Sequence, residues 1–67
     1  MRKSQAVQVI RRLKPIPVFD LSEAERQELV TAFGVFIESR PSQAEYRDVL
    51  TRVTLLPEML FYFEPRG

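Results

Sequence analysis

Apolar residues recur at helical spacing in three stretches of the chain. The first stretch, residues 4–14, has an apolar face that consists of Ala6, Val9, Ile10 and Leu13. This spacing is typical of one face of an amphipathic helix, and Ser4 is a suitable N-cap for it. Pro15 and Pro17 end the helix, because a proline pushes the residue before it out of the α region. Residues 15–20 are therefore predicted to form a connector.

The second and third stretches begin with the same helix-start signal. The chain reads S-E-A-E from Ser22 and S-Q-A-E from Ser42, and both have the S-x-x-E form of a capping box. Apolar periodicity then predicts helices over about residues 23–39 and 43–56. Together they make up a predicted helical hairpin over residues 22–56.

The C-terminal segment, residues 57–67, is aromatic. Phe61 and Tyr62 belong to a run of three aromatic residues, and Pro57 either ends the third helix or begins a further short turn. The segment is predicted to form a short fourth helix or a strand. A domain this small needs the apolar burial that large side chains provide. The alternating pattern therefore predicts that Phe61 and Phe63 face the core, while Leu60 and Tyr62 face outward.

These elements predict a small all-α domain with three helices and a short fourth helix or terminal strand. An α+β alternative pairs residues 16–19 with residues 59–63 as two short strands. The second helix is apolar around much of its circumference, so it needs neighbours on more than one side. The predicted core consists of Leu13, Leu29, Phe33, Phe36, Tyr46, Leu50 and Val53.

The chain is short, and it has neither cysteine nor histidine among its 67 residues. A domain of about this size buries only ~60% of the surface that its unfolded chain exposes, so small folds usually need a disulfide, a metal or a partner. The lack of cysteine excludes a disulfide, and carboxylates alone favour Mg²⁺ or Ca²⁺ over zinc. We therefore expect self-association or docking on a larger protein.

Neither a membrane span nor a secretory leader is expected. No uninterrupted apolar run approaches the ~20 residues that a spanning helix needs. The first 14 residues lack the continuous apolar region of a signal peptide. We therefore expect a cytoplasmic protein.

The residue types that usually carry catalysis are absent or have another explanation. Without His and Cys the chain lacks an ordinary proton carrier near neutral pH and a thiol nucleophile. Ser22 and Ser42 are explained as helix caps, and no glycine-rich phosphate loop is present. Glu25 and Glu28 could together bind Mg²⁺, but such pairs are common on solvated helix faces. The sequence predicts a protein that is not an enzyme and binds no metal or other cofactor.

Positive charge is concentrated at the N-terminal end. Residues 1–19 contain five bases and no acid, whereas the rest of the chain is mildly acidic. A contact with nucleic acid is one interpretation, since Arg and Gln make bidentate contacts to bases. A membrane or targeting segment is a second, and an ordinary helix paired with the acidic body is a third. The candidate nucleic-acid contacts are Arg2, Lys3, Gln8, Arg11, Arg12 and Lys14.

Two functions are compatible with these features. The first is a small protein–protein interaction module, acting as an adaptor, an inhibitor or an accessory subunit of a larger complex, or as a homo-oligomer. A glycine inside the second helix permits a close helix–helix approach, and aromatic residues often anchor interfaces. The predicted protein-interface residues are Gly34, Val35, Leu60 and Tyr62. The alternative is a small dimeric DNA-binding regulator of the antitoxin type, of bacterial or phage origin, with a basic N-terminal helix.

Overall fold

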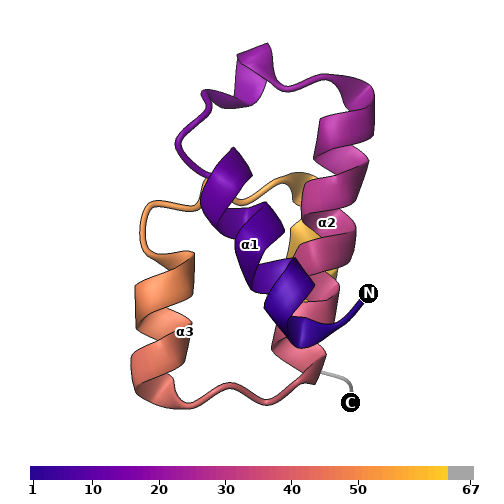
Figure 1. Cartoon of the computed structure of the whole chain (residues 1–67). Coiled ribbons are helices and arrows are strands. Elements are labelled where there is room, and N and C mark those ends of the chain that lie inside the picture. Colours follow the sequence, from indigo (N-terminus) through magenta and orange to yellow (C-terminus); the bar gives the residue numbers. More distant parts are fainter. Residues whose placement is uncertain (64–67) are drawn as a thin grey trace.

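The computed structural model describes the backbone of residues 1–63 and every side chain in that range except those of Phe61 and Phe63. Helices and short 3-10 segments follow one another along the chain (Figure 1). Their bounds are α1 Lys3–Leu13, η1 Val18–Asp20, α2 Glu23–Glu38, α3 Gln43–Leu50 and η2 Pro57–Phe63. No strand occurs among the described residues, so the predicted all-α fold class is confirmed.

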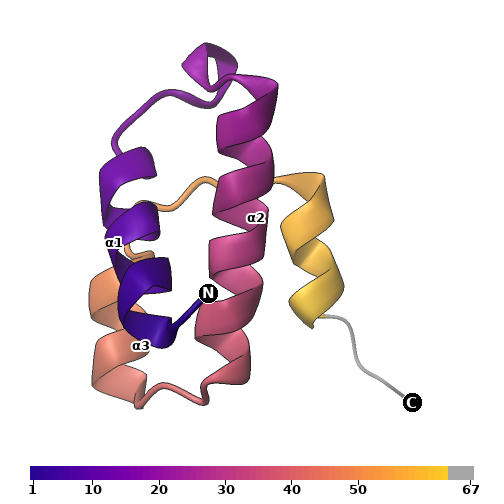
Figure 2. The same cartoon turned by 45° about the vertical axis from the view of Figure 1, so that its right-hand side comes forward.

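Helix α2 lies at the centre of the fold. Helix α1 packs against α2, and α3 packs against α1. Segment η2 contacts α2 on the side away from α1, as Figure 2 shows. This arrangement explains the wide apolar surface of α2, because neighbours cover two of its sides.

The core lies between α1 and α2 and is completed by side chains from the other elements. Its buried apolar residues are Ala6, Ile10, Leu13, Leu21, Leu29, Ala32, Phe33, Phe36, Val49, Leu56 and Met59. Four of the predicted core residues are in this set. The other three, Tyr46, Leu50 and Val53, are half-buried and pack against it. Val49 and Met59 provide the full burial that these three were expected to provide.

Helix α3 ends at Leu50, whereas apolar periodicity predicted that it continues to residue 56. Thr51 is extended, with φ −60° and ψ 130°, and Arg52 adopts a left-handed φ of 68°. Three of the four residues 51–54 are β-branched, and such side chains favour extended backbone over helix. A prediction based only on the spacing of apolar residues does not take the β-branched residues into account, so the predicted helix was too long.

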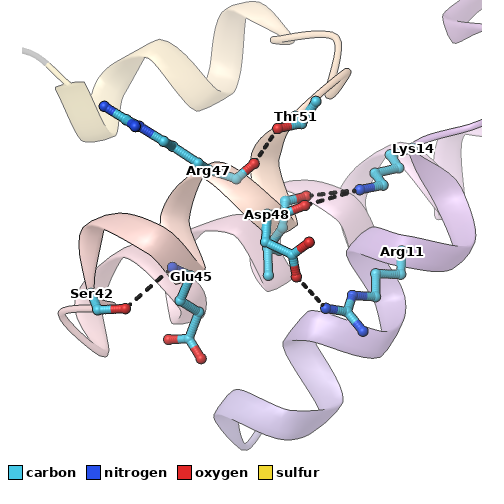
Figure 3. A network of polar contacts seen from close by, with 8 residues as sticks. Arg11, Lys14, Ser42, Glu45, Arg47, Asp48 and Thr51 are labelled. Atoms are coloured by element: carbon cyan, nitrogen blue, oxygen red, sulfur yellow. Dashed lines mark hydrogen bonds and ion pairs between the residues drawn. The ribbon is translucent and has the colours of Figure 1, made fainter.

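Polar side chains bind the carbonyl groups in the last turn of α3 (Figure 3). Lys14 Nζ donates to the carbonyl oxygens of Val49 at 3.2 Å and Asp48 at 3.4 Å. Thr51 Oγ1 donates to the carbonyl of Arg47. The last carbonyls of a helix lack intrahelical partners, and a cation is favourable beside them. The early end of α3 is therefore stabilised by Lys14, the C-cap residue of α1, as well as by Thr51, its own C-cap residue.

Ser22 and Ser42 form the predicted N-caps of α2 and α3, and only the motif at Ser22 closes as a complete capping box. The prediction for Ser4 is wrong, because α1 begins at Lys3 with Arg2 as its N-cap. At α2, Glu25 N donates to Ser22 Oγ at 3.1 Å, and Ser22 N donates to Glu25 Oε1 at 2.9 Å. At α3, Glu45 N donates to Ser42 Oγ at 3.2 Å. The Glu45 carboxylate instead lies 2.5 Å from Lys3 Nζ. An ion pair with α1 thus replaces the reciprocal half of the second box.

We expect the contribution of Glu25 to stability to disappear in acid. The backbone N–H of Ser22, and after it the Ser22 hydroxyl, hold the pKa of the Glu25 carboxyl below its ordinary value. A carboxyl with a lowered folded-state pKa stabilises the fold above its unfolded pKa of about 4.3, and this is lost as the pH falls through the lowered value. Urea unfolding should therefore show Glu25→Gln to be less stable than wild type at neutral pH. The two curves should converge in acid, and a gap that is independent of pH would contradict this.

Two 3-10 segments occupy the places where the α+β alternative put strands. Asp20 N donates to the carbonyl of Pro17 at 2.8 Å, and Met59 N donates to that of Leu56 at 2.9 Å. Each bond joins residues three apart, which is the 3-10 pattern, and no strand occurs among the described residues. The predicted strand pairing is therefore wrong. Residues 51–56, which we call the linker, connect α3 to η2.

Candidate interaction surfaces

Ion pairs attach the basic helix α1 to α3. Lys3 Nζ lies 2.5 Å from Glu45 Oε1. In the last turn of α1, Arg11 Nη2 lies 2.7 Å from Asp48 Oδ2. Figure 3 draws this contact as a dashed line. All four side chains are between about a third and two-thirds exposed, so each pair is expected to contribute only about 0.2–1 kcal/mol. Their common effect is to place α3 alongside α1.

Two further bases of α1 also have partners within the fold. Arg12 pairs with Glu28 of α2, and Lys14 binds the carbonyls of α3. Arg2 and Gln8 are exposed. Four of the six candidate nucleic-acid residues therefore contact the acidic body or its backbone. This is the arrangement expected for an ordinary helix paired with the acidic body. A contact between these residues and nucleic acid stays a prediction.

The ring of Tyr62 lies directly on Gly34. A Cβ at position 34 would stand 2.6 Å from Tyr62 Cζ, closer than real Cβ contacts come. The same ring meets Phe33 edge-on, with centroids 5.8 Å apart and an interplanar angle of 62°, an arrangement that aromatic pairs favour. Gly34 does permit a close approach, as the sequence suggested, but within this chain the approaching group is an aromatic ring of η2 rather than another helix.

The orientation of Tyr62 corrects the prediction that it faces outward. Tyr62 is half-buried and packs against the core. In a 3-10 segment, residues three apart lie on the same side, so Tyr62 lies on the same buried side as Met59. The strand-like alternation assumed in the prediction would have put these two residues on opposite sides. Leu60 is exposed, and the inward orientation predicted for the phenylalanines on either side of Tyr62 lies outside the described side chains. Val35 is half-buried, and the role of the four predicted interface residues in partner binding stays a prediction.

Phe19 is a surface feature that the sequence reasoning missed. Its side chain is 98% exposed, more than any other large apolar side chain in the described part of the chain. The half-buried residues Ile16 and Val18 on its N-terminal side pack against the core, and so does the buried Leu21 after it. The sequence did contain a signal for this exposure, because Phe19 is an aromatic residue in the proline-rich connector and belongs to none of the apolar helix faces. The prediction treated all residues of the connector alike.

The turn that carries Phe19, seen at the top of Figure 1, is held in one conformation by its neighbours. Pro17 fixes its own φ at −56°, and its carbonyl accepts the bond from Asp20 N described above. Leu21 N donates to the carbonyl of Val18 at 3.3 Å, and Ile16 N donates to that of Leu13 at 3.0 Å. A proline removes backbone freedom. Phe19 is therefore presented to solvent from a turn with little freedom of its own.

A shallow depression of about 770 Å³ lies where α2 and η2 meet. Arg26 Nη2 and Glu58 Oε1 stand 3.8 Å apart at its edge. Its lining is mixed polar and apolar and consists of Leu21, Glu23, Arg26, Gln27, Val30, Thr31 and Glu58.

Glu25 and Glu28, the two carboxylates considered for Mg²⁺, each have a partner within the fold. Glu25 closes the Ser22 cap, and Glu28 pairs with Arg12. Among the residues that the structure describes, no group of three or more His, Cys, Asp or Glu could hold a metal ion. None of the helices in this part of the chain has the length and apolar content to cross a membrane. No protein-family model, no curated protein and no solved structure matches the chain.

Proposed function

We propose that this chain is a non-enzymatic protein-binding module of the cytoplasm, acting as an adaptor, an inhibitor or an accessory subunit, or through self-association. The observation that carries the proposal is the exposure of Phe19 on a turn whose backbone is fixed. The turn does not need this side chain for its own packing, since Phe19 is 98% exposed. A phenylalanine in that position has a clear role only when something else covers it.

Burial of Phe19 in a partner would provide a large part of a binding energy. Moving a phenylalanine side chain out of water contributes about 1.5–3 kcal/mol. A fixed turn also reduces the entropy that is lost on binding, because the anchor is already oriented. Aromatic side chains that enter a partner's pocket are the usual hot spots of interfaces. Leu60, which is 48% exposed, is a predicted interface residue that also remains accessible to a partner.

The test is a comparison of two serine variants in the same capture experiment. Immobilised wild-type, Phe19→Ser and Leu55→Ser chains are exposed to extract of the native host, and each captured protein is quantified by mass spectrometry. Leu55 is the matched control because it is also an exposed apolar residue, at 47%. A partner identified in this way is then titrated against all three chains. We expect Phe19→Ser to bind about 10- to 100-fold more weakly, from the burial energy above.

The fold of the variants has to be checked for this result to be informative. Phe19→Ser should unfold in urea within about 0.5 kcal/mol of wild type, since the side chain is solvated. Equal affinity of wild type and Phe19→Ser for every captured protein would overturn the role of Phe19. Equal losses for both serine variants would indicate non-specific apolar adhesion instead of an anchor.

The DNA-binding alternative is supported by the accessibility of two arginines. The side chains of Arg11 and Arg12 are 55% and 63% exposed although both are ion-paired. Exposed pairs are weak, so phosphates could replace the carboxylates. This alternative requires micromolar affinity for duplex DNA of any sequence at low salt, with a steep decline as salt is added. Fluorescence anisotropy with a labelled duplex measures both, and undetectable binding at low salt removes the alternative.

A further inference from the structure

Segment η2 is attached to the helical part of the chain by few, separable contacts. Met59 is fully buried, and Tyr62 rests on Gly34 and Phe33. One ion pair, Arg26–Glu58, joins the segment to α2 at 3.8 Å. We call the surface of α2 that receives η2 the η2 site. None of these contacts depends on η2 belonging to the same chain as α2.

The linker, which joins η2 to the rest of its own chain, has two features of a hinge. Arg52 adopts a left-handed φ of 68°, a conformation in which the Cβ of an ordinary residue is crowded. Thr51, Arg52, Thr54 and Leu55 are exposed. The β-branched residues of the linker favour an extended backbone, yet no strand pairs with it in the described structure. An opened, extended linker would relieve the strained residue and suit the local sequence.

We infer that the η2 site also accepts the η2 segment of a second copy of this chain, which gives a dimer with exchanged C-terminal segments. Such an exchange recreates every contact of η2 between chains, so no new complementary surface is needed. The inference rests on the proposed function, because it specifies the self-associating form of the module. Its cost is the entropy of bringing two chains together, so the exchanged form increases with concentration.

The fit of the site to this occupant is specific. The absence of a side chain at Gly34 provides room for one aromatic ring, and Phe33 presents a partner for that ring. Arg26 lies where Glu58 of the incoming segment arrives. The chain also has no cysteine, so a disulfide cannot hold η2 on its own α2. The segment that satisfies these three requirements is η2 itself.

Two single-cysteine chains test the exchange. Arg26→Cys and Glu58→Cys chains are mixed, unfolded in urea, refolded together at several concentrations and treated with a short bis-maleimide crosslinker. Mass spectrometry then separates mixed dimers from like dimers, because the two chains differ in mass. A chain with both substitutions is the control for reach, since it should crosslink internally. The matched background control is the mixture of Arg26→Cys with Gln43→Cys, which is an exposed position outside the η2 site.

We expect the Arg26→Cys and Glu58→Cys mixture to yield several-fold more mixed dimer than the background mixture, with a fraction that rises with concentration. Adding Gly34→Leu to the Arg26→Cys chain should reduce the yield to background, because the ring of Tyr62 can no longer be seated. A yield equal to background at every concentration would overturn the exchange. Phe19→Ser in both chains should leave the yield of mixed dimer unchanged. Failure of the exchange can therefore be told apart from failure of the proposed role of Phe19 in partner binding.

A shortened linker provides a second measurement that does not depend on crosslinking. Deletion of Thr54 and Leu55 shortens the linker from six residues to four, so we expect docking of η2 on the α2 of its own molecule to be disfavoured relative to docking between molecules. Sedimentation should show this variant as a dimer at concentrations where the wild-type chain is mainly monomeric. The same deletion combined with Gly34→Leu should be a monomer. A monomeric deletion variant with an intact helical spectrum would contradict the inference.

Discussion

Replacement of Met59 with alanine is expected to lower the free energy of unfolding by about 2–5 kcal/mol, the range for large-to-small substitutions in cores. Met59 is fully buried although it lies in a short 3-10 segment, and its Sδ accepts a hydrogen bond from Leu56 N at 3.3 Å. The substitution removes the main apolar link between η2 and the core. A single core in a domain this small rarely supplies more than about 3–5 kcal/mol, so much of the variant should be unfolded at 25 °C.

The adjacent residue is the matched control for this substitution. Leu60 belongs to the same segment but is 48% exposed, so Leu60→Ala should cost about 1 kcal/mol or less. Urea titrations followed by circular dichroism measure both variants. If Met59→Ala unfolds at the same urea concentration as Leu60→Ala, η2 does not complete the core.

The second large effect is the change in stability caused by Gly34→Ala, and its sign depends on whether Tyr62 is present. In the wild-type chain, Gly34→Ala should lower stability by up to about 2 kcal/mol. Overpacking costs about 1–3 kcal/mol, and the gain of about 1 kcal/mol from replacing a glycine inside a helix offsets part of it. The overpacking arises because the new Cβ would lie 2.6 Å from Tyr62 Cζ.

In a Tyr62→Ala chain the same substitution should raise stability by up to about 1 kcal/mol. The ring that obstructs the new methyl group is gone, and only the helix propensity of alanine remains. The four chains form a double-mutant cycle, whose coupling energy reports the contact between positions 34 and 62. If Gly34→Ala were stabilising by equal amounts in both backgrounds, the ring could not be seated on Gly34.

Local signals in the sequence were sufficient to predict that three helices form and where α2 and α3 begin. Ser22 and Ser42 cap α2 and α3 because a cap depends on a few neighbouring residues. Sequence reasoning did not find that Glu45 binds Lys3 instead of closing its capping box. That choice depends on where α1 lies relative to α3, which local patterns do not encode.

The end of α3 and the orientation of Tyr62 show two different reasons for failure. At Leu50, apolar periodicity and β-branched residues made opposite predictions, and the weight given to periodicity was too high. At Tyr62 the residue pattern was read with a period of two, whereas the 3-10 segment has a period of three. The exposure of Phe19 was not predicted, because the connector was treated as uniform, whereas Ile16 and Val18 pack against the core and Phe19 does not.

Helix α3 is attached to α1 partly by ion pairs, whereas α1, α2 and η2 are held together mainly by apolar packing. Salt affects these two kinds of contact differently. Ion pairs between exposed side chains weaken as screening increases, whereas strongly hydrated salts such as sulfate strengthen apolar burial. Helix α3 buries Val49 and packs Tyr46 and Leu50 against the core, and Lys3, Arg11 and Lys14 add polar contacts to it. Concentrated sulfate would therefore weaken the ion pairs that attach α3 to α1 while it tightens the apolar packing among α1, α2 and η2.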